Sequence, residues 1–287
     1  MPNFLVKSCY ASSMTSDLIR EGGELVSDVA AAAGAASGAE PTSGSVMAEE
    51  MARDSVLGDA NLPYPFGFTH TMHRALLYAA SERLMTLSWC LSSDPYPHVA
   101  SASELARAAA EAASTAWWLT DQEADGERRL HRMLGLLEVS NKEESRLQRD
   151  LGLPVKDGGT QLSLKWGRNV GLTIESPPSR TELLQRCSPT GGVDYRRLSA
   201  VAHSTAYALF AIWLEVQEAQ EANNVEPIRL HALMSAAVAA RYVIIGIHGA
   251  SRAAGVDRGQ WKEVTHRAED FEARVVSAAS ALSGQAP

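Results

Sequence analysis

A stretch in the C-terminal half of the chain, VDYRRLSAVAHSTAYALFAIW, combines polar side chains whose types could perform chemistry. Each residue of an α-helix turns by about 100°, so Arg196 and His203, seven residues apart, point in nearly the same direction. Ser199 lies about one turn from each, and Tyr207 lies one turn beyond His203. The same geometry turns Arg197 away, which makes it the weaker candidate. The pattern predicts a polar stripe that binds a phosphate and moves a proton near neutral pH.

The segment SASELARAAAEAASTAWWLTD predicts a second helix that could complete this stripe. Arg107 and Glu111 are four residues apart, so they share a face, and the small alanines around them permit a close helix approach. One hypothesis is that Glu111 accepts a hydrogen bond from Arg196 or orients His203 across the bundle. The alternative is an exposed Arg107–Glu111 pair that contributes about 0.3 kcal/mol.

Other candidate residues have a structural interpretation beside the chemical one. The stripe itself is also what a solvated arginine and a satisfied buried histidine would look like. His70 and His73 could form a metal pair, but a solvated or capping role is favoured because no third ligand falls at a usable spacing. Trp118 is kept as a candidate binding residue, although a place in the core is the favoured interpretation. We predict no metal site and no cofactor, since no nucleotide-binding, hydrolase or zinc-protease motif occurs.

The rest of the chain predicts an all-α, up-and-down bundle. Alanine is the best helix former, apolar residues recur at helical spacing, and strand patterns are rare. An irregular insertion at 151–193, with a short β-hairpin in the alternating stretch 161–174, separates the third long helix from the fourth. The six long helices are expected at about 69–91, 101–119, 125–150, 194–222, 227–254 and 258–282.

Residues 1–60 are expected to form a mostly flexible segment, rich in alanine, glycine and serine, ahead of a single helical domain at 61–287. This segment holds three basic side chains against nine acidic ones, so it carries most of the net charge of −8. The remaining chain is nearly neutral, which excludes nucleic-acid binding over a broad basic surface but allows a local phosphate site. With no secretory signal and an apolar stretch at 236–247 too short to span a bilayer, we expect a cytoplasmic protein without membrane contact.

The two helices together resemble a known group of proteins. RAAAEAASTAWWL and YRRLSAVAHS are similar to a group of actinobacterial helical proteins with an Arg-x-x-x-Glu helix and a YRxLS-x-x-x-H helix, which in turn resembles the HEPN superfamily. That superfamily carries an arginine followed by four to six residues and then a histidine; here five residues separate Arg197 from His203 and six separate Arg196 from it. The resemblance implies a metal-independent RNase that works as a homodimer, with His203 as acid/base and Arg196 or Arg197 on the phosphate.

Three functions therefore remain open. The first is an RNase-like enzyme of stress response or defence, and the second is a non-catalytic helical binding or regulatory module. The third is a small-molecule enzyme that uses the Arg/Glu/Ser/His pocket. The expected partner is RNA or a small phosphorylated or otherwise anionic ligand.

Overall fold

The computed structural model describes residues 2–92, 98–153, 159–202, 206–222 and 224–282; the side chains of 2–14, 159, 202 and 206–209 lie outside this description. Regular structure in these ranges is helical, with no strand among them, which confirms the all-α class. In chain order the elements are α1 (Pro2–Gly38), α2 (Val46–Met51), α3 (Asp54–Leu57), α4 (Pro65–Leu91), α5 (Val99–Leu119), α6 (Gly126–Asp150), α7 (Gly159–Asn169), α8 (Arg180–Cys187), α9 (Gly191–Ala202), α10 (Ala206–Ala222), α11 (Glu226–Ala254), the 3-10 turn η1 (Arg258–Trp261) and α12 (Lys262–Leu282).

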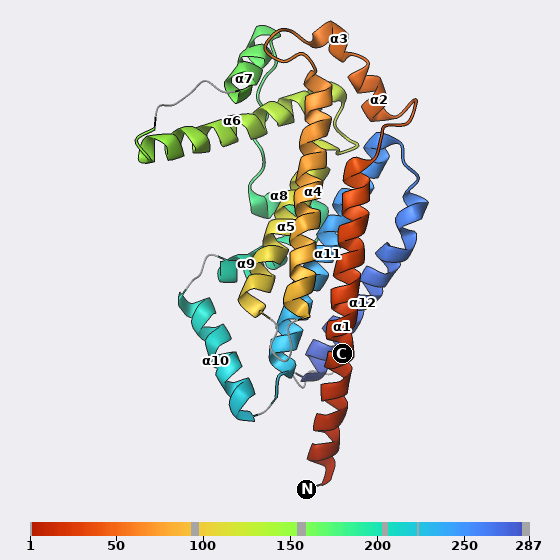
Figure 1. Cartoon of the computed structure of the whole chain (residues 1–287), viewed down its shortest axis with the longest axis vertical. Helices are drawn as coiled ribbons and strands as arrows, with labels where there is room; N and C mark the ends of the chain where they lie inside the picture. Colours follow the sequence, from red (N-terminus) through yellow and green to blue (C-terminus); the bar gives the residue numbers. More distant parts are fainter. Residues whose placement is uncertain (1, 93–97, 154–158, 203–205, 223, 283–287) are drawn as a thin grey trace.

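Five helices, α1, α4, α5, α11 and α12, run along the long axis of the molecule and share one hydrophobic core (Figure 1). Helix α11 packs against the other four. Small residues allow this: a Cβ on Gly246 of α11 would lie only 3.2 Å from the backbone oxygen of Ala113 on α5. The alanine bias of the sequence therefore serves close helix packing as well as helix formation.

Helix α11 extends the apolar stretch noted in the sequence on both sides. By length and composition it holds an 18-residue window that could cross a membrane, and 78% of this window is buried inside the bundle. A helix that is apolar on all sides is expected at the centre of a helical core, where α11 lies.

The N-terminal segment differs from its prediction as a mostly flexible region. Residues 2–38 form α1, which packs along α4 and α11. Leu25, Val26, Val29 and Ala33 are buried, and their spacing of one, three and four residues is helical. The Ser81 hydroxyl of α4 also donates to the backbone oxygen of an α1 residue. The alanines and glycines that suggested flexibility are the residues that let α1 approach its neighbours.

At one end of the bundle, α6 crosses the long helices and is joined by α2, α3 and α7 (Figure 1). Helix α7 stands where the sequence predicted a β-hairpin, so that prediction is wrong. Ser163, Leu164 and Gly167 are buried at helical spacing with Trp166 beside them, and the Trp166 indole donates to the backbone oxygen of Leu57 at 2.9 Å. The alternation of apolar and polar residues in 161–174 does not reflect a strand, because the buried positions of α7 follow the helical period.

A buried polar cluster holds α2, α4 and α6 together at this end. The Glu50 carboxylate accepts hydrogen bonds from Arg129, at 2.6 Å from Nη2, and pairs with His70 Nε2 at 2.9 Å. His73 is 1% exposed, and neither of its ring nitrogens has a partner among the described residues. The prediction that His70 and His73 are solvated or capping is therefore wrong, because α2 and α6 cover the start of α4.

The predicted helix 194–222 corresponds to two elements, α9 and α10, with residues 203–205 between them outside the description. The insertion at 151–193 contains α7, α8 and the start of α9. Because α1 is added and the range 194–222 is described as two elements, the arrangement of six long helices is not confirmed.

Candidate functional site

The predicted polar stripe begins on α9, which ends at Ala202. Arg196 is exposed on this helix, whereas Ser199 is buried. His203 lies outside the described residues, and so does the side chain of Tyr207 on α10. The alignment of Arg196 with His203 on one helix therefore stays a prediction.

Arg197, rather than Arg196, turns toward the interior of the bundle. Asp194 and Val201, three residues before and four residues after it, are both buried. Burial lowers the pKa of Arg197, against the opposing effect of the carboxylates of Asp194 and Glu215. The ring of His231 on α11 lies 3.5 Å from Glu215, from Nδ1 to Oε2. Burial and the Arg197 charge lower the pKa of His231, so these three side chains form a cluster between α9, α10 and α11.

Glu111 is engaged by arginines other than Arg196. Its carboxylate accepts from Arg107 Nε at 2.7 Å and from the guanidinium of Arg180 on α8. Arg107 also donates to the hydroxyl of Tyr195 and lies 5.4 Å from the centre of its ring. The interpretation of Arg107–Glu111 as an exposed pair is wrong, because α8 and α9 cover this face of α5. Glu111 makes no hydrogen bond to Arg196 among the described residues, and its predicted orientation of His203 lies outside them.

The two adjacent tryptophans of α5 have different surroundings. Trp118 is fully buried, with the guanidinium of Arg132 5.0 Å from its ring centre. Trp117 is half-buried and forms one wall of a pocket between α5, α11 and α12. The two residues face different sides of α5, because neighbours on a helix are turned by about 100°.

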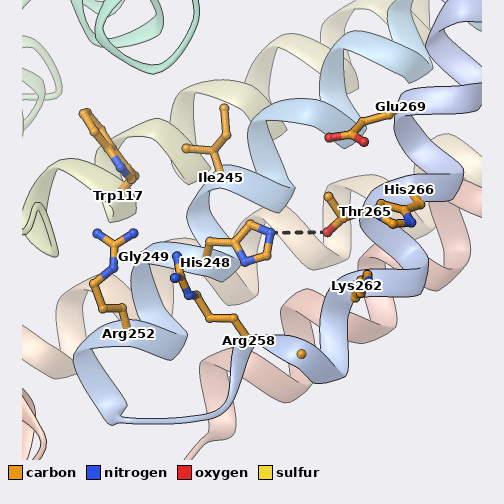
Figure 2. A pocket seen from close by; sticks show the side chains of 11 residues that line it. Trp117, Ile245, His248, Gly249, Arg252, Arg258, Lys262, Thr265, His266 and Glu269 are labelled. Atoms are coloured by element: carbon orange, nitrogen blue, oxygen red, sulfur yellow. Dashed lines mark hydrogen bonds between the residues drawn. The ribbon is translucent and has the colours of Figure 1, made fainter.

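This pocket has a volume of about 540 Å³, within the range of small-molecule sites. Figure 2 shows the Arg252 guanidinium directed toward Trp117 and Arg258 directed toward His248. The pocket is lined mainly by basic and polar side chains from the end of α11, η1 and the start of α12: Ile245, His248, Gly249, Arg252, Arg258, Gly259, Lys262, Thr265, His266 and Glu269, besides Trp117.

Local sequence signals place these elements. Helix α11 ends at Gly255, whose φ of +71° is a left-handed conformation that favours glycine at a C-terminal cap. Asp257 then caps the following turn by accepting from Gly259 N at 2.8 Å. This tight connection brings the first turn of α12 back beside the last turns of α11. His248 and Arg252 on one helix and Lys262 on the other therefore border the same space.

Three basic side chains that line this pocket are unpaired among the described residues. Arg252, Arg258 and Lys262 form no ion pair or side-chain hydrogen bond with any residue that the structure describes. Glu269 is the single carboxylate among the lining residues. Many other arginines of the bundle are paired with carboxylates, as Arg128, Arg129 and Arg241 are. Unpaired cations gathered around one cavity are typical of an anion site.

His248 supplies a titratable group at the floor of the pocket. Its Nε2 lies 3.2 Å from the hydroxyl of Thr265, which itself donates to the backbone oxygen of Trp261. Nε2 is therefore the donor, and the buried Nδ1, which has no partner among the described atoms, is the site that takes up a proton. Burial and the charges of Arg258 and Arg252 lower the pKa of His248.

Sequence reasoning missed this site. The segment HGASRAAGVDRGQWKEVTHR does contain the signal, since His248 and Arg252 are four residues apart, as are Arg258, Lys262 and His266. Spacing of four marks one face on each helix, but the chain reversal at Gly255 that makes these faces meet is visible only in the fold.

Comparison of the chain with family models, with curated proteins and with solved structures found no match in any of the three.

Proposed function

We propose that the protein is a helical binding module that takes a small phosphorylated or otherwise anionic ligand into the pocket between α5, α11 and α12. The observation that carries the proposal is the gathering of three unpaired cations, Arg252, Arg258 and Lys262, around one cavity of about 540 Å³. Guanidinium groups bind phosphate oxygens in pairs, and lysine adds a point charge.

The dimensions and the charge balance favour a small ligand over a long nucleic acid. The protein as a whole is acidic, with a net charge of −8, so a polyanion would be repelled outside the pocket. A small ligand requires only the local field of the cavity. We keep the expectation of a cytoplasmic protein, where phosphorylated metabolites are plentiful, as part of this proposal.

Thermal unfolding with inorganic pyrophosphate tests the proposal, since a ligand that binds only the folded state stabilises it by an amount that grows with the logarithm of its concentration above Kd. At constant ionic strength, pyrophosphate should raise the Tm of the wild type. The double variant R258Q/K262Q should lose most of this rise. A matched control, K142Q/R146Q, removes two exposed cations with the same spacing from α6 and should keep it. No rise for the wild type, or an equal rise for R258Q/K262Q, would overturn the proposal.

A second candidate is the RNase-type activity that the sequence resemblance implies. The cluster of Arg197, Glu215 and His231 favours it, because an arginine stands near a histidine that a carboxylate can orient. In this alternative Arg197 binds the scissile phosphate, and His203 or His231 transfers the proton.

Incubation of labelled RNA with the purified protein in EDTA tests this second candidate. The RNase function requires that the wild type cleave RNA and that this cleavage be lost in R197A and in either H203A or H231A. It also requires that cleavage persist in R258Q/K262Q, because that variant leaves α9 intact. Intact RNA with the wild type would reject the RNase function and leave the anion-binding proposal unchanged.

A further inference from the structure

A second pocket of about 490 Å³ is also lined by Trp117 and Arg252. The two pockets therefore adjoin at these two side chains, and a molecule held between them would occupy parts of both. We call the pocket described above the first chamber and this one the second chamber. The second chamber is completed by the loop after α5 and by the end of α8: Asp121, Gln122, Glu123 and Arg186.

The chemistry of the second chamber differs from that of the first. Two carboxylates, two guanidinium groups and one amide line it, so it is less basic than the first chamber. The carboxylate of Asp121 is already used, since Oδ2 lies 3.4 Å from Arg132 and Oδ1 accepts from the Glu123 backbone. The side chains of Gln122 and Glu123, by contrast, make no hydrogen bond or ion pair within the described residues. They are exposed and available to a ligand.

We propose that the ligand is a nucleoside monophosphate whose phosphate occupies the first chamber and whose base occupies the second. This inference rests on the proposed anion binding. The phosphate meets Arg258 and Lys262, while the flat base lies against Trp117 and the Arg252 guanidinium, both of which stack on aromatic rings.

The edge of the base accounts for the unused polar groups of the second chamber. An amino group on the base donates to the Glu123 carboxylate, and the Gln122 amide both donates and accepts, as the donor and acceptor pattern of a base requires. A simple phosphate or pyrophosphate would leave these groups without a role. A sugar phosphate could contact these groups, but it has no aromatic ring to stack on Trp117.

Calorimetric titration separates the contribution of the base from that of the phosphate. Ribose 5-phosphate is compared with AMP, GMP, CMP and UMP on the wild type, on Q122A/E123A, and on E144A/Q148A, a control pair of the same residue types exposed on α6. We expect at least one nucleotide to bind about tenfold tighter than ribose 5-phosphate, the gain of one stacked and hydrogen-bonded base. Q122A/E123A should remove most of this gain without changing the affinity for ribose 5-phosphate, and E144A/Q148A should bind as the wild type does.

The outcomes distinguish the inferred base site from the proposed anion site on which it rests. If ribose 5-phosphate and pyrophosphate bind but no nucleotide binds more tightly, the base site is wrong and the anion site stands. If a nucleotide binds more tightly and Q122A/E123A leaves that gain intact, the second chamber does not hold the base. If neither nucleotides nor pyrophosphate bind, both proposals fail together.

Discussion

Gly249 of α11 stands directly against Trp117 of α5: a Cβ built on the glycine would lie 3.3 Å from Cδ1 of the indole and 2.7 Å from the hydroxyl of Thr120. The absence of a side chain at Gly249 therefore sets how closely α11 approaches α5. It also sets the position of the tryptophan that forms a wall of both chambers.

Replacing this glycine should disturb packing and the pocket together. In G249A the added methyl must displace Thr120 or Trp117, and overpacking of this kind costs about 1–3 kcal/mol. We expect urea unfolding to show that loss. The control is G38A at the end of α1, where a Cβ meets nothing within 4 Å. Equal midpoints for G249A and G38A would show that the contact does not constrain α5.

The affinity of the first chamber for an anion should rise as the pH falls. The pKa of His248 lies below its usual value, so the ring is neutral in the empty pocket at pH 7. A bound anion favours the protonated ring and raises this pKa, so binding takes up a proton. Sulfate is the probe, because its charge is constant between pH 5 and 8.

Titrations of sulfate from pH 7.5 to 5.5 at fixed ionic strength should therefore give a steadily decreasing Kd. In H248Q, which keeps a donor for Thr265, the dependence should flatten. A wild-type Kd that is the same at both ends of the range would contradict the role given to His248.

How much the sequence could predict depends on whether a property is local. The helical class and the bounds of α5 and α6 follow from residue preferences and period, and they are close to the expected ones. The burial of α1 could not be predicted, because flexible linkers and closely packed helices are both rich in alanine and glycine. The pocket was missed because Trp117 and Lys262 are far apart in the chain, and only the packing of α5, α11 and α12 brings them together.

Local spacing also could not show which residues of the predicted polar stripe face the bundle. A helical wheel fixes the angles between neighbours, so it separates Arg196 from Arg197. It does not say which side of α9 faces the bundle. The structure turns Arg197 inward, toward His231 on a helix that the wheel does not contain.

The buried His73 of α4 should make the free energy of unfolding depend on pH below pH 7. Burial, with the charges of His70, Arg74 and Arg129, lowers the pKa of His73 to about 3. In the unfolded chain it is about 6.5. Between these values the unfolded state binds a proton that the folded state does not. Stability therefore falls with decreasing pH, by up to about 1.4 kcal/mol per pH unit.

Urea unfolding at pH 6.5 and pH 5 measures this slope. We expect H73L, which removes the titrating ring from the core, to show a smaller loss of stability between the two values than the wild type. H266Q, a substitution of an exposed histidine, should keep the wild-type slope. An unchanged slope in H73L would mean that other groups account for the acid sensitivity.

Isothermal titration of inorganic pyrophosphate into the wild type, R258Q/K262Q and K142Q/R146Q at constant ionic strength tests the anion site most directly. The account predicts one site per chain in the wild type and in K142Q/R146Q with the same Kd, and at least a tenfold weaker Kd in R258Q/K262Q. Equal heats and equal Kd values in all three proteins, or no binding to the wild type, would contradict it.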